Sequence, residues 1–577
     1  MFLQMPEADE EELDLEQRAA VEATAGAIAV LAGPGSGKTR TLSHRARHLL
    51  RTHPGSKALL LTFTNKAAAE MKARAVGVAA VSSDRIDAST FHSFGLRLLR
   101  SHGELIGLAA DFEVLDERDA EEFADDVAAA TGTRSALRAW QFNRLRRLTP
   151  SASVSAFGEA YQAAKLAEEV TDFDDLVAYS ADLLATNEQL ARAYGGRYAH
   201  LLVDEFQDTN AVQFEIVRSL CAHVASVSVF ADDDQAIFRF VGADTENIRS
   251  FVRELGAQPY PLTCNYRSRT QIVDHANSLI AADPKASGRQ MRASKAGGEV
   301  GLRTFSSVEE EAETLAEEIE AVTSDAPPTS VAILVRSGYR ANDLVAALRQ
   351  RHIPVTDWRG DIHEPPGRRA IVTAMSALRG TLNERRARRL SEFLGVPETD
   401  ERETQAFLRG LPGNSIAAAL LELRAMAFRG ATTSALAQQA QAAVTEVDRG
   451  LGERATAVVE AVADLERWNA DFSVDDLLAE LALGSGGRGP TQGGGVRVAS
   501  LHKTKGLQWP TVYLLGLEDG HMPDYRSEED ELPDERRACF VGVCRAEDRL
   551  NITFARRFMM HPRRPSRFLR ELGLLDT

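Results

Sequence analysis

Short apolar runs, separated by polar or helix-like stretches, recur along this chain. They lie at residues 27–32, 57–63, 200–205, 226–232, 331–336 and 511–516. Each run has the length of a buried strand, and the alternation of such runs with helical sequence is typical of parallel sheets whose strands are joined by helices. The spread of these runs predicts an α/β protein with two separate cores.

Two long stretches interrupt this pattern with Ala, Leu, Glu and Arg at helical spacing. They extend from about residue 100 to 195 and from about 367 to 483, and we interpret each as a helical insertion in one core. The segment GSGGRGPTQGGG that follows is too rich in glycine for a helix or strand, so it is expected to be a flexible return linker. The predicted units are a first core (1–100 and 195–270), its insertion (101–194), a second core (271–366 and 496–577) and a shortened insertion with its linker (367–495).

The composition is that of a multidomain globular protein. The chain has 577 residues, more than one ordinary core, with 44% hydrophobic and 26% charged residues. No apolar stretch reaches the ~18 residues that span a bilayer, and the first residues lack the order of a signal peptide, so we expect a cytoplasmic protein without a membrane partner. The formal net charge of −17 argues against a basic coat over the whole surface, although a local groove can still be positive.

A glycine-rich segment, AGPGSGKT, follows the first apolar run and precedes a helical stretch. Glycines here let backbone N–H groups close around phosphates, Lys38 can reach the β- and γ-phosphates, and the Thr39 hydroxyl can hold Mg²⁺. A chance GKT in a glycine-rich turn is the competing interpretation, and Ala32 stands where the strict motif has glycine. The predicted ATP-binding loop consists of Ala32, Gly33, Pro34, Gly35, Ser36, Gly37, Lys38 and Thr39.

An acidic pair ends the later run LLVDEFQD. Asp204 is suited to hold Mg²⁺ through water, and Glu205 to orient or activate the attacking water. A DE pair alone is weak evidence, but together with the upstream loop it predicts an NTP-hydrolysing site. Such a site also needs arginines that approach the γ-phosphate when two domains close. Arg267 and Arg545 are candidates, although by residue type alone any of the 67 basic residues is more readily a solvated surface charge.

These segments belong to a longer ordered set of motifs. In chain order they read LDLEQRAAV, the phosphate loop with Arg40 behind it, TFTNKAAAEM, STFHSF, FDDL, LVDEFQDTN, FADDDQAIFRFVGA, LTCNYRS, VAILVRS, LHKTKGLQW and ERRACFVGVCRAEDRL. Over nearly its whole length the chain therefore resembles the UvrD/Rep-type superfamily 1 DNA helicases. The resemblance implies two RecA-like P-loop NTPase domains, each with a helical insertion, that use ATP and Mg²⁺.

The resemblance also implies roles around the nucleotide. Gln17 would read the adenine edge and Tyr266 would stack on the base, while Arg40 and Gln508 complete the ATP-binding set. Arg267 and Arg545 would act as two arginine fingers, and Gln235 would couple the γ-phosphate to the DNA track. Gln508 stands where the family usually has Glu, and a neutral amide can still hydrogen-bond a ribose hydroxyl, without charge assistance.

Single-stranded DNA and its junctions with duplex are the implied partners. By position in the motifs, Phe63, Phe238 and Phe240 are expected to stack on bases, which tolerates any sequence. The backbone would be lined by Thr90, His92, Arg336 and His502. For each phenylalanine, packing in a core is the alternative.

The leading functional hypothesis is an ATP-dependent helicase or translocase that moves on single-stranded DNA and unwinds duplex, in repair, recombination or replication restart. The resemblance implies that it moves 3′ to 5′. The alternative is a DNA-stimulated ATPase subunit of a larger repair or phage-defence complex with little unwinding of its own. The shortened second insertion and Val241, where the family usually has Arg, motivate it. A small-molecule kinase would leave the downstream motifs without a role.

Overall fold

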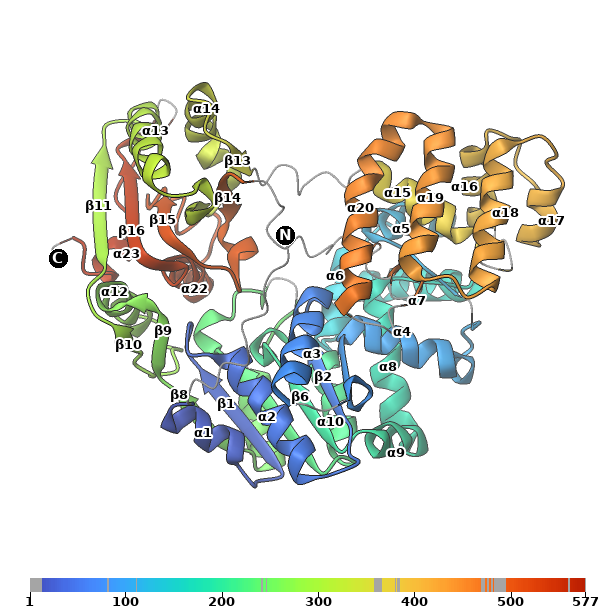
Figure 1. Cartoon of the computed structure of the whole chain (residues 1–577), viewed down its shortest axis with the longest axis horizontal. Helices are drawn as coiled ribbons and strands as arrows, with labels where there is room; N and C mark the ends of the chain where they lie inside the picture. Colours follow the sequence, from blue (N-terminus) through green and yellow to red (C-terminus); the bar gives the residue numbers. More distant parts are fainter. Residues whose placement is uncertain are drawn as a thin grey trace.

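Two parallel β-sheets and a lobe of long helices make up the molecule (Figure 1). The structure, a computed structural model, describes residues 13–79, 82–110, 112–239, 242–244, 246–356, 366–378, 384–468, 494–558 and 561–575, with 380, 473, 474, 477, 478 and 481 between them. In the view of Figure 1 one sheet lies at the bottom, the second at the upper left, and the helical lobe at the upper right.

The first sheet has the strand order β3-β2-β6-β7-β1-β8, and every neighbouring pair is parallel. Its central strands are covered on both faces, so most of their residues are apolar. The edge strand β8 contains Pro259 and Pro261, which lack an N–H and are tolerated where one side of a strand has no partner. The strands are β1 (Ala27–Ala32), β2 (Ala58–Thr62), β3 (Ile86–Thr90), β6 (His200–Val203), β7 (Ser226–Ala231) and β8 (Gln258–Leu262).

Two hydrophobic clusters cover the faces of this sheet. Successive residues of a strand point to opposite faces, so Leu60 lies in one cluster and its neighbours Leu59 and Leu61 in the other. The first cluster is completed by α1 (Leu15–Glu22), α2 (Lys38–Thr52) and α3 (Asn65–Ala79). The second is completed by α4 (Phe91–His102), α8 (Phe173–Thr186), α9 (Glu188–Arg197), α10 (Ala211–Cys221) and α11 (Glu246–Leu255).

The second sheet has the order β11-β16-β15-β12-β14-β13, again with parallel neighbours. Its strands are β11 (Glu299–Phe305), β12 (Val331–Val335), β13 (Val355–Thr356), β14 (Val496–Ser500), β15 (Trp509–Leu515) and β16 (Ala546–Ala555). One face packs on α12 (Thr270–Ala281), α22 (Leu532–Val543) and α23 (Phe568–Glu571), the other on α13 (Val308–Asp325) and α14 (Asn342–Gln350). Two small pairs flank it, β9 (Cys264–Arg269) with β10 (Arg292–Lys295), and β17 (Arg557–Phe558) with β18 (His561–Pro562).

A small helical unit interrupts the first core. It contains β4 (Glu113–Val114), α5 (Glu117–Thr131), α6 (Leu137–Leu145), α7 (Ala152–Ala167) and β5 (Val170–Thr171), with its own hydrophobic cluster. A buried ion cluster ties α7 to α8: the Lys165 Nζ lies 2.8 Å from Asp172 and 2.5 Å from Asp175, and Arg144 of α6 also pairs with Asp175. Removing one partner from such a cluster destabilises the protein, because the charge left behind is buried and unpaired.

Replacing Lys165 with methionine is therefore expected to lower the free energy of unfolding by about 3–5 kcal/mol, because two carboxylates would stay buried without their ammonium partner. Urea unfolding measures the loss, and hydrogen exchange in α7 locates it. The matched control is Arg192→Met, which removes an exposed i,i+4 pair with Glu188 that contributes at most about 0.5 kcal/mol. Equal losses in the two variants would contradict a stabilising role for the cluster.

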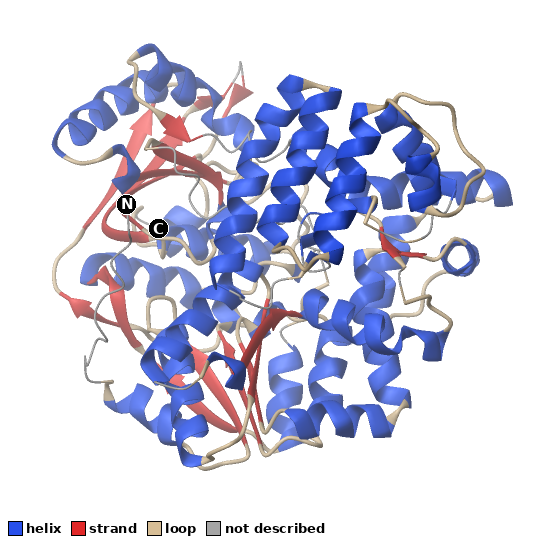
Figure 2. Ribbon diagram, turned by 45° about the vertical axis from the view of Figure 1, so that its right-hand side comes forward, coloured by secondary structure: helices blue, strands red, loops and turns tan. Residues whose placement is uncertain are grey.

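The helical lobe interrupts the second core between β13 and β14. Its helices are α15 (Pro366–Ser376), α16 (Glu384–Leu394), α17 (Thr404–Arg409), α18 (Ser415–Phe428), α19 (Thr433–Val447) and α20 (Arg449–Trp468), around one hydrophobic cluster. Figure 2 shows these helices standing over the first insertion and the first core. The contact is ionic in part: Arg386 and Arg389 of α16 each lie 3.4 Å from Glu113, and Arg389 also pairs with Asp119 of α5.

The architecture confirms the predicted α/β class, and each apolar run coincides with a strand: β1, β2, β6, β7, β12 and β15. Within the range predicted for the first insertion, α8 and α9 contribute to the cluster of the first sheet, while α5 to α7 form the separate one. Most of the glycine-rich linker lies outside the described residues. Among the described helices, none combines the length and apolar character needed to cross a bilayer.

Candidate nucleotide site and DNA-facing residues

The chemistry-bearing residues of the first core lie where its parallel strands end. The phosphate loop follows β1, Asp204 follows β6 and Asp232 follows β7, and these three strands are neighbours in the sheet. The carboxyl edge of a parallel sheet is where open α/β folds bind their ligands. The strand order thus brings a phosphate-binding loop and two acidic segments together.

The phosphate loop has the backbone conformation that its glycines allow. Gly35 and Gly37 have φ angles of 71° and 75°, in the left-handed region that glycine adopts without strain. A side chain on Gly35 would also place a Cβ 2.7 Å from the Cβ of Arg267. Because α2 begins at Lys38, the N–H groups of its first turn face the loop, which is the usual anion-binding arrangement at a helix N-terminus.

The Lys38 side chain lies beside the two acidic residues that follow β6. Its Nζ is 2.6 Å from a Glu205 oxygen and 3.7 Å from Asp204. Burial alone would lower the pKa of Lys38, but the charges of Glu205 and Asp204 outweigh it and hold the pKa above its usual value. Burial raises the pKa of Asp204 to about 6. For Glu205, burial is outweighed by the charges of Lys38 and Lys505, which lower the pKa to about 2.

The two predicted arginines both pack with the second core. Arg267 lies in the range predicted for the first core, but its strand β9 contacts β16 of the second sheet. Arg545 follows α22 and is 1% exposed, and its guanidinium donates to the Gln235 side-chain oxygen (2.7 Å) and to the Leu507 carbonyl (3.0 Å). Burial lowers the pKa of Arg545 to about 9, so it remains charged at neutral pH. Arg267 of β9 donates to the Gln508 side chain (2.7 Å) and to the Cys544 carbonyl (3.0 Å). Both arginines therefore lie beside the site.

The structure also brings in Lys505, which the sequence alone did not single out. Its Nζ lies 2.5 Å from Asp208 and 2.9 Å from the Gln235 carbonyl, and 3.8 Å from Glu205. Lys505 lies on the second core, so it is a further cation that reaches the acidic segments of the first. LHKTKGLQW contains two lysines, and nothing in the local sequence distinguishes Lys505 from Lys503.

On the adenine side, Gln17 and Tyr266 are held by local contacts. Gln17 is 2% exposed, and its amide donates to the Ser36 carbonyl (2.9 Å), which fastens α1 to the phosphate loop. Reading an adenine edge would require this amide to exchange partners. The Tyr266 ring is partly exposed, with its hydroxyl donating to Asp14 (2.5 Å) and its N–H to Gly35 (2.9 Å). A ring fixed beside the loop in this way is suited to stacking on a base.

The remaining predicted nucleotide ligands lie around the same loop. Thr39 and Arg40 occupy the first turn of α2 and are half-buried, and Gly33 donates its N–H to the Leu262 carbonyl at the end of β8. The side-chain oxygen of Gln508 accepts a hydrogen bond from Arg267, so this oxygen already has a partner within the protein.

In the first core, the predicted DNA contacts are largely packed. Phe63 is half-buried against Phe91, with ring centroids 5.9 Å apart. Thr90 is 1% exposed, and its hydroxyl caps α4 by accepting from the Ser93 N–H (3.0 Å), so contact with a DNA phosphate would require this cap to open. His92 lies edge-on to Phe173, and burial lowers its pKa to about 4, so it can offer DNA a hydrogen bond but no charge.

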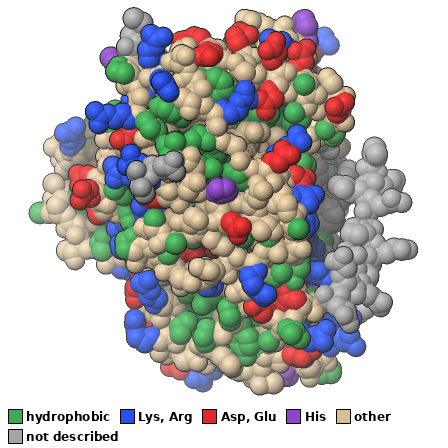
Figure 3. All heavy atoms as spheres, turned by 90° about the vertical axis from the view of Figure 1, so that its left-hand side faces the viewer, with side chains coloured by type: hydrophobic (Ala, Val, Ile, Leu, Met, Phe, Trp, Pro, Cys, Tyr) green, Lys and Arg blue, Asp and Glu red, His purple; other side chains and the backbone are tan. Residues whose placement is uncertain are grey.

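Phe238, in the segment after β7, and His502 of the second core form a pair with ring centroids 6.5 Å apart. Burial lowers the pKa of His502 to about 4, with the charge of Arg336 adding to the effect. Arg336 makes a bidentate ion pair with buried Glu535, at 2.6 to 3.1 Å. Phe240, the third predicted stacking residue, and Val241 lie outside the described residues. On the face of the second core in Figure 3, basic and acidic side chains are interspersed.

The fold and the site define a class. Two parallel-sheet cores face each other across a phosphate loop and its acidic partners. The second core supplies Arg545 and Lys505 to the first, and Arg267 lies beside Gly35 of the loop. This arrangement is that of a P-loop NTPase whose domains close around the nucleotide.

The comparisons with known proteins give the family. A model described as the UvrD/REP helicase N-terminal domain matches residues 13–255, and one described as the UvrD-like helicase C-terminal domain matches 260–401 and 435–557. DNA helicase II of Salmonella typhimurium is 31% identical over 97% of this chain and 87% of its own length. ATP-dependent DNA helicase Rep of Escherichia coli is 29% identical (96% and 93%), and PcrA of Staphylococcus epidermidis 28% (98% and 87%).

The chain therefore belongs to the UvrD/REP helicase family, and it is an ATP-dependent DNA helicase. Helicases of this type use ATP, generally with Mg²⁺, and act on DNA. The residues present fit both: a glycine loop at a helix N-terminus for phosphates, and paired carboxylates beside it for a hard cation.

Proposed function

We propose that this protein is a motor that moves 3′ to 5′ along single-stranded DNA in the cytoplasm and unwinds duplex at single-strand/double-strand junctions, serving repair, recombination or replication restart. The observation that carries the proposal is the contact of two cations of the second core with the first: Lys505 bonds Asp208 and the Gln235 carbonyl, and Arg545 bonds the Gln235 side chain. A site built from two cores performs hydrolysis only when they approach, so each turnover changes their separation.

Each site residue has a task in this proposal. Lys38 exchanges Glu205 for the β- and γ-phosphate oxygens, which frees both carboxylates. Thr39 and Asp204 would hold Mg²⁺, which would supply positive charge beside the phosphates, and Glu205 would orient the attacking water. Arg267 and Arg545 turn toward the γ-phosphate as the cores close.

The coupling to DNA runs through the segment after β7. Gln235 bonds Arg545, and three residues later Phe238 contacts His502 of the second core. Lys505 contacts both Gln235 and Phe238, because its Nζ bonds the Gln235 carbonyl and lies 5.4 Å from the centre of the Phe238 ring. A movement of Lys505 on hydrolysis therefore shifts an aromatic side chain that is suited to hold a base.

We also propose the fourfold division of the chain given above, with the cores as the motor and the two insertions as the parts that meet duplex or partner proteins. The separate hydrophobic clusters of α5–α7 and of α15–α20 support it.

Unwinding of two duplexes that differ only in carrying a 3′ or a 5′ single-stranded tail tests the polarity. With ATP and Mg²⁺, the purified chain is expected to separate the 3′-tailed duplex and to leave the 5′-tailed one paired. A blunt duplex of the same sequence is the control for tail-independent melting. Preference for the 5′ tail would contradict the proposal.

A second candidate is the DNA-stimulated ATPase subunit of a repair or phage-defence complex. The engagement of Arg336 by Glu535 and of Thr90 by Ser93 favours it, because both side chains are expected DNA contacts that are already bonded within the protein. Stimulation of hydrolysis by single strands without unwinding of either duplex would support this candidate.

A further inference from the structure

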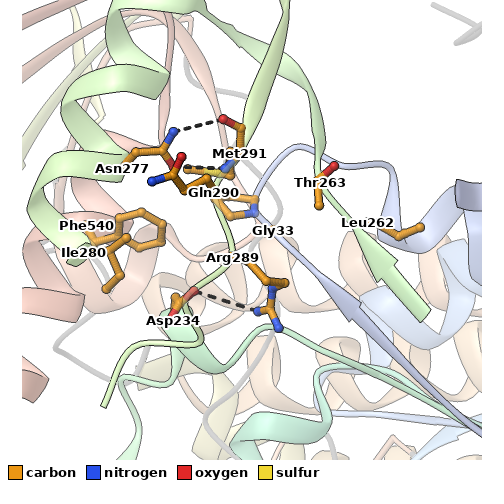
Figure 4. A pocket seen from close by; sticks show the side chains of 11 residues that line it. Gly33, Asp234, Leu262, Thr263, Asn277, Ile280, Arg289, Gln290, Met291 and Phe540 are labelled. Atoms are coloured by element: carbon orange, nitrogen blue, oxygen red, sulfur yellow. Dashed lines mark hydrogen bonds and ion pairs between the residues drawn. The ribbon is translucent and has the colours of Figure 1, made fainter. Parts of the chain in front are cut away.

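Three consecutive acidic residues precede Gln235 in the turn after β7, and one arginine faces all of them. The NH2 group of Arg289 lies 3.0 Å from Asp233, 3.6 Å from Asp232 and 3.9 Å from Asp234. Figure 4 shows Arg289 directed at Asp234 beside a small pocket next to the phosphate loop. Ser287 adds two hydrogen bonds to Asp234, from its N–H (2.9 Å) and its hydroxyl (2.5 Å).

The arginine and the acidic turn belong to different cores. Arg289 lies in the segment between α12 and β10, and α12 packs on α22 and β16 of the second core. The acidic turn continues β7 of the first sheet. Just beyond it, Ile237 is buried in a hydrophobic cluster of the second core. The acidic turn thus extends from the first core and is bound by residues of the second core.

The acidic turn sets the orientation of Gln235. The Gln235 amide nitrogen donates to Asp232 (2.5 Å), and its oxygen accepts from Arg545 (2.7 Å). An amide has one donor end and one acceptor end, so fixing the nitrogen on Asp232 turns the oxygen toward the arginine. If Asp232 lost its charge or moved, the amide could rotate and present its nitrogen to Arg545, which has no acceptor.

The geometry points to Arg289 as a positioning residue for ATP hydrolysis. Its ion pairs bind the Asp232–Asp234 turn to the second core, and this keeps the Gln235 amide in place for its hydrogen bond with Arg545. Arg289 reaches no nucleotide atom in this role and acts through Asp232. The inference rests on the proposed roles of Gln235 and Arg545 and extends them by naming what aligns the pair.

Burial supports the need for such a cation. It raises the pKa of Asp232 to about 7, and Arg289 opposes the rise. The other groups facing Asp232 are Gln235, which lowers its pKa by a hydrogen bond, Asp234, which raises it, the thiol of Cys544, and the cations Lys38, Arg267 and Arg545. Without Arg289 the pKa of Asp232 rises further, so the ionised form that Gln235 requires is lost as the pH falls through a higher value.

Steady-state hydrolysis of ATP by the full chain at saturating single-stranded DNA tests the inference. Arg289→Gln is expected to lower kcat about tenfold to hundredfold, with the KM for ATP changed less than about twofold. Its acidic limb in the kcat–pH profile should move up by about one pH unit. Arg289→Lys keeps the charge and is expected to restore the profile and much of kcat. Arg192→Gln, in an exposed pair on α9, is the matched control.

A double substitution separates positioning from general damage. If Arg289 acts through Asp232, then Arg289→Gln in an Asp232→Asn background should cost far less than in the wild type, because the two residues form one unit. Additive losses would overturn the inference, as would an unchanged kcat or a loss that is independent of pH and not rescued by lysine. Thermal unfolding of each variant identifies any loss caused by misfolding, in which case the Arg289→Lys profile decides.

The same assay distinguishes failure of this inference from failure of the proposed site. Arg545→Ala is measured in parallel with the Arg289 variants. If Arg545→Ala turns over normally, the roles given to Gln235 and Arg545 are wrong. If it is inactive while Arg289→Gln is normal, only the positioning role is wrong.

Discussion

Replacing Lys38 with alanine is expected to reduce DNA-stimulated ATP hydrolysis about 10²–10³-fold, since the substitution removes a cation aimed at the phosphates in a buried site. It also leaves Asp204 and Glu205 without the ammonium group that lies 2.6 Å from Glu205. Lys505, 3.8 Å from Glu205, would be the remaining cation beside the two carboxylates, so they would repel the triphosphate and ATP binding is expected to weaken as well. Initial rates at saturating single-stranded DNA measure turnover, and fluorescent-nucleotide titration measures binding.

The control for Lys38→Ala is Lys57→Ala. Lys57 precedes β2 at its amino-terminal end, on the edge of the same sheet opposite the phosphate loop, so its loss removes one charge without touching the site. Turnover of Lys38→Ala within tenfold of the control, in a preparation free of other ATPases, would show that this loop does not bind the hydrolysed phosphate.

The sequence predicted six strands inside the two sheets and missed the edge strands, as well as β14 and β16 inside the second sheet. β2 and β7 are wholly buried, so they read as apolar runs. The edge strands β8 and β11 are largely exposed or half-exposed, and β8 carries two prolines, so neither has a run to detect. β16 lies inside its sheet, but three of its first four residues, AEDR, are charged. The strand therefore does not begin as an apolar run, although its second half is largely buried. The α/β class followed from the central strands alone.

The site divides in the same way into local and long-range parts. The phosphate loop and Asp204–Glu205 are contiguous motifs at strand ends, so residue order was enough to predict their meeting. Lys505 with Asp208, and Arg289 with Asp232–Asp234, are pairs of residues far apart in sequence. The position of a charged residue in the sequence does not indicate which residue it will pair with. Only the packing of the two cores reveals these contacts. The bidentate hold of Glu535 on Arg336 was hidden for the same reason.

Alanine at Arg545 is expected to lower hydrolysis about 10³–10⁵-fold, the scale of an arginine that stabilises the transferred phosphate. Arg545→Lys should recover little, because an ammonium group cannot make the forked contacts to Leu507, Val541 and Gln235. ATP binding should persist in both variants, since Lys38 and the loop are intact, and this separates them from Lys38→Ala. Arg549→Ala, exposed on β16, is the control. Turnover near that of the control in a folded Arg545 variant would leave Arg267 and Lys505 as the only cations from the second core that act on the nucleotide.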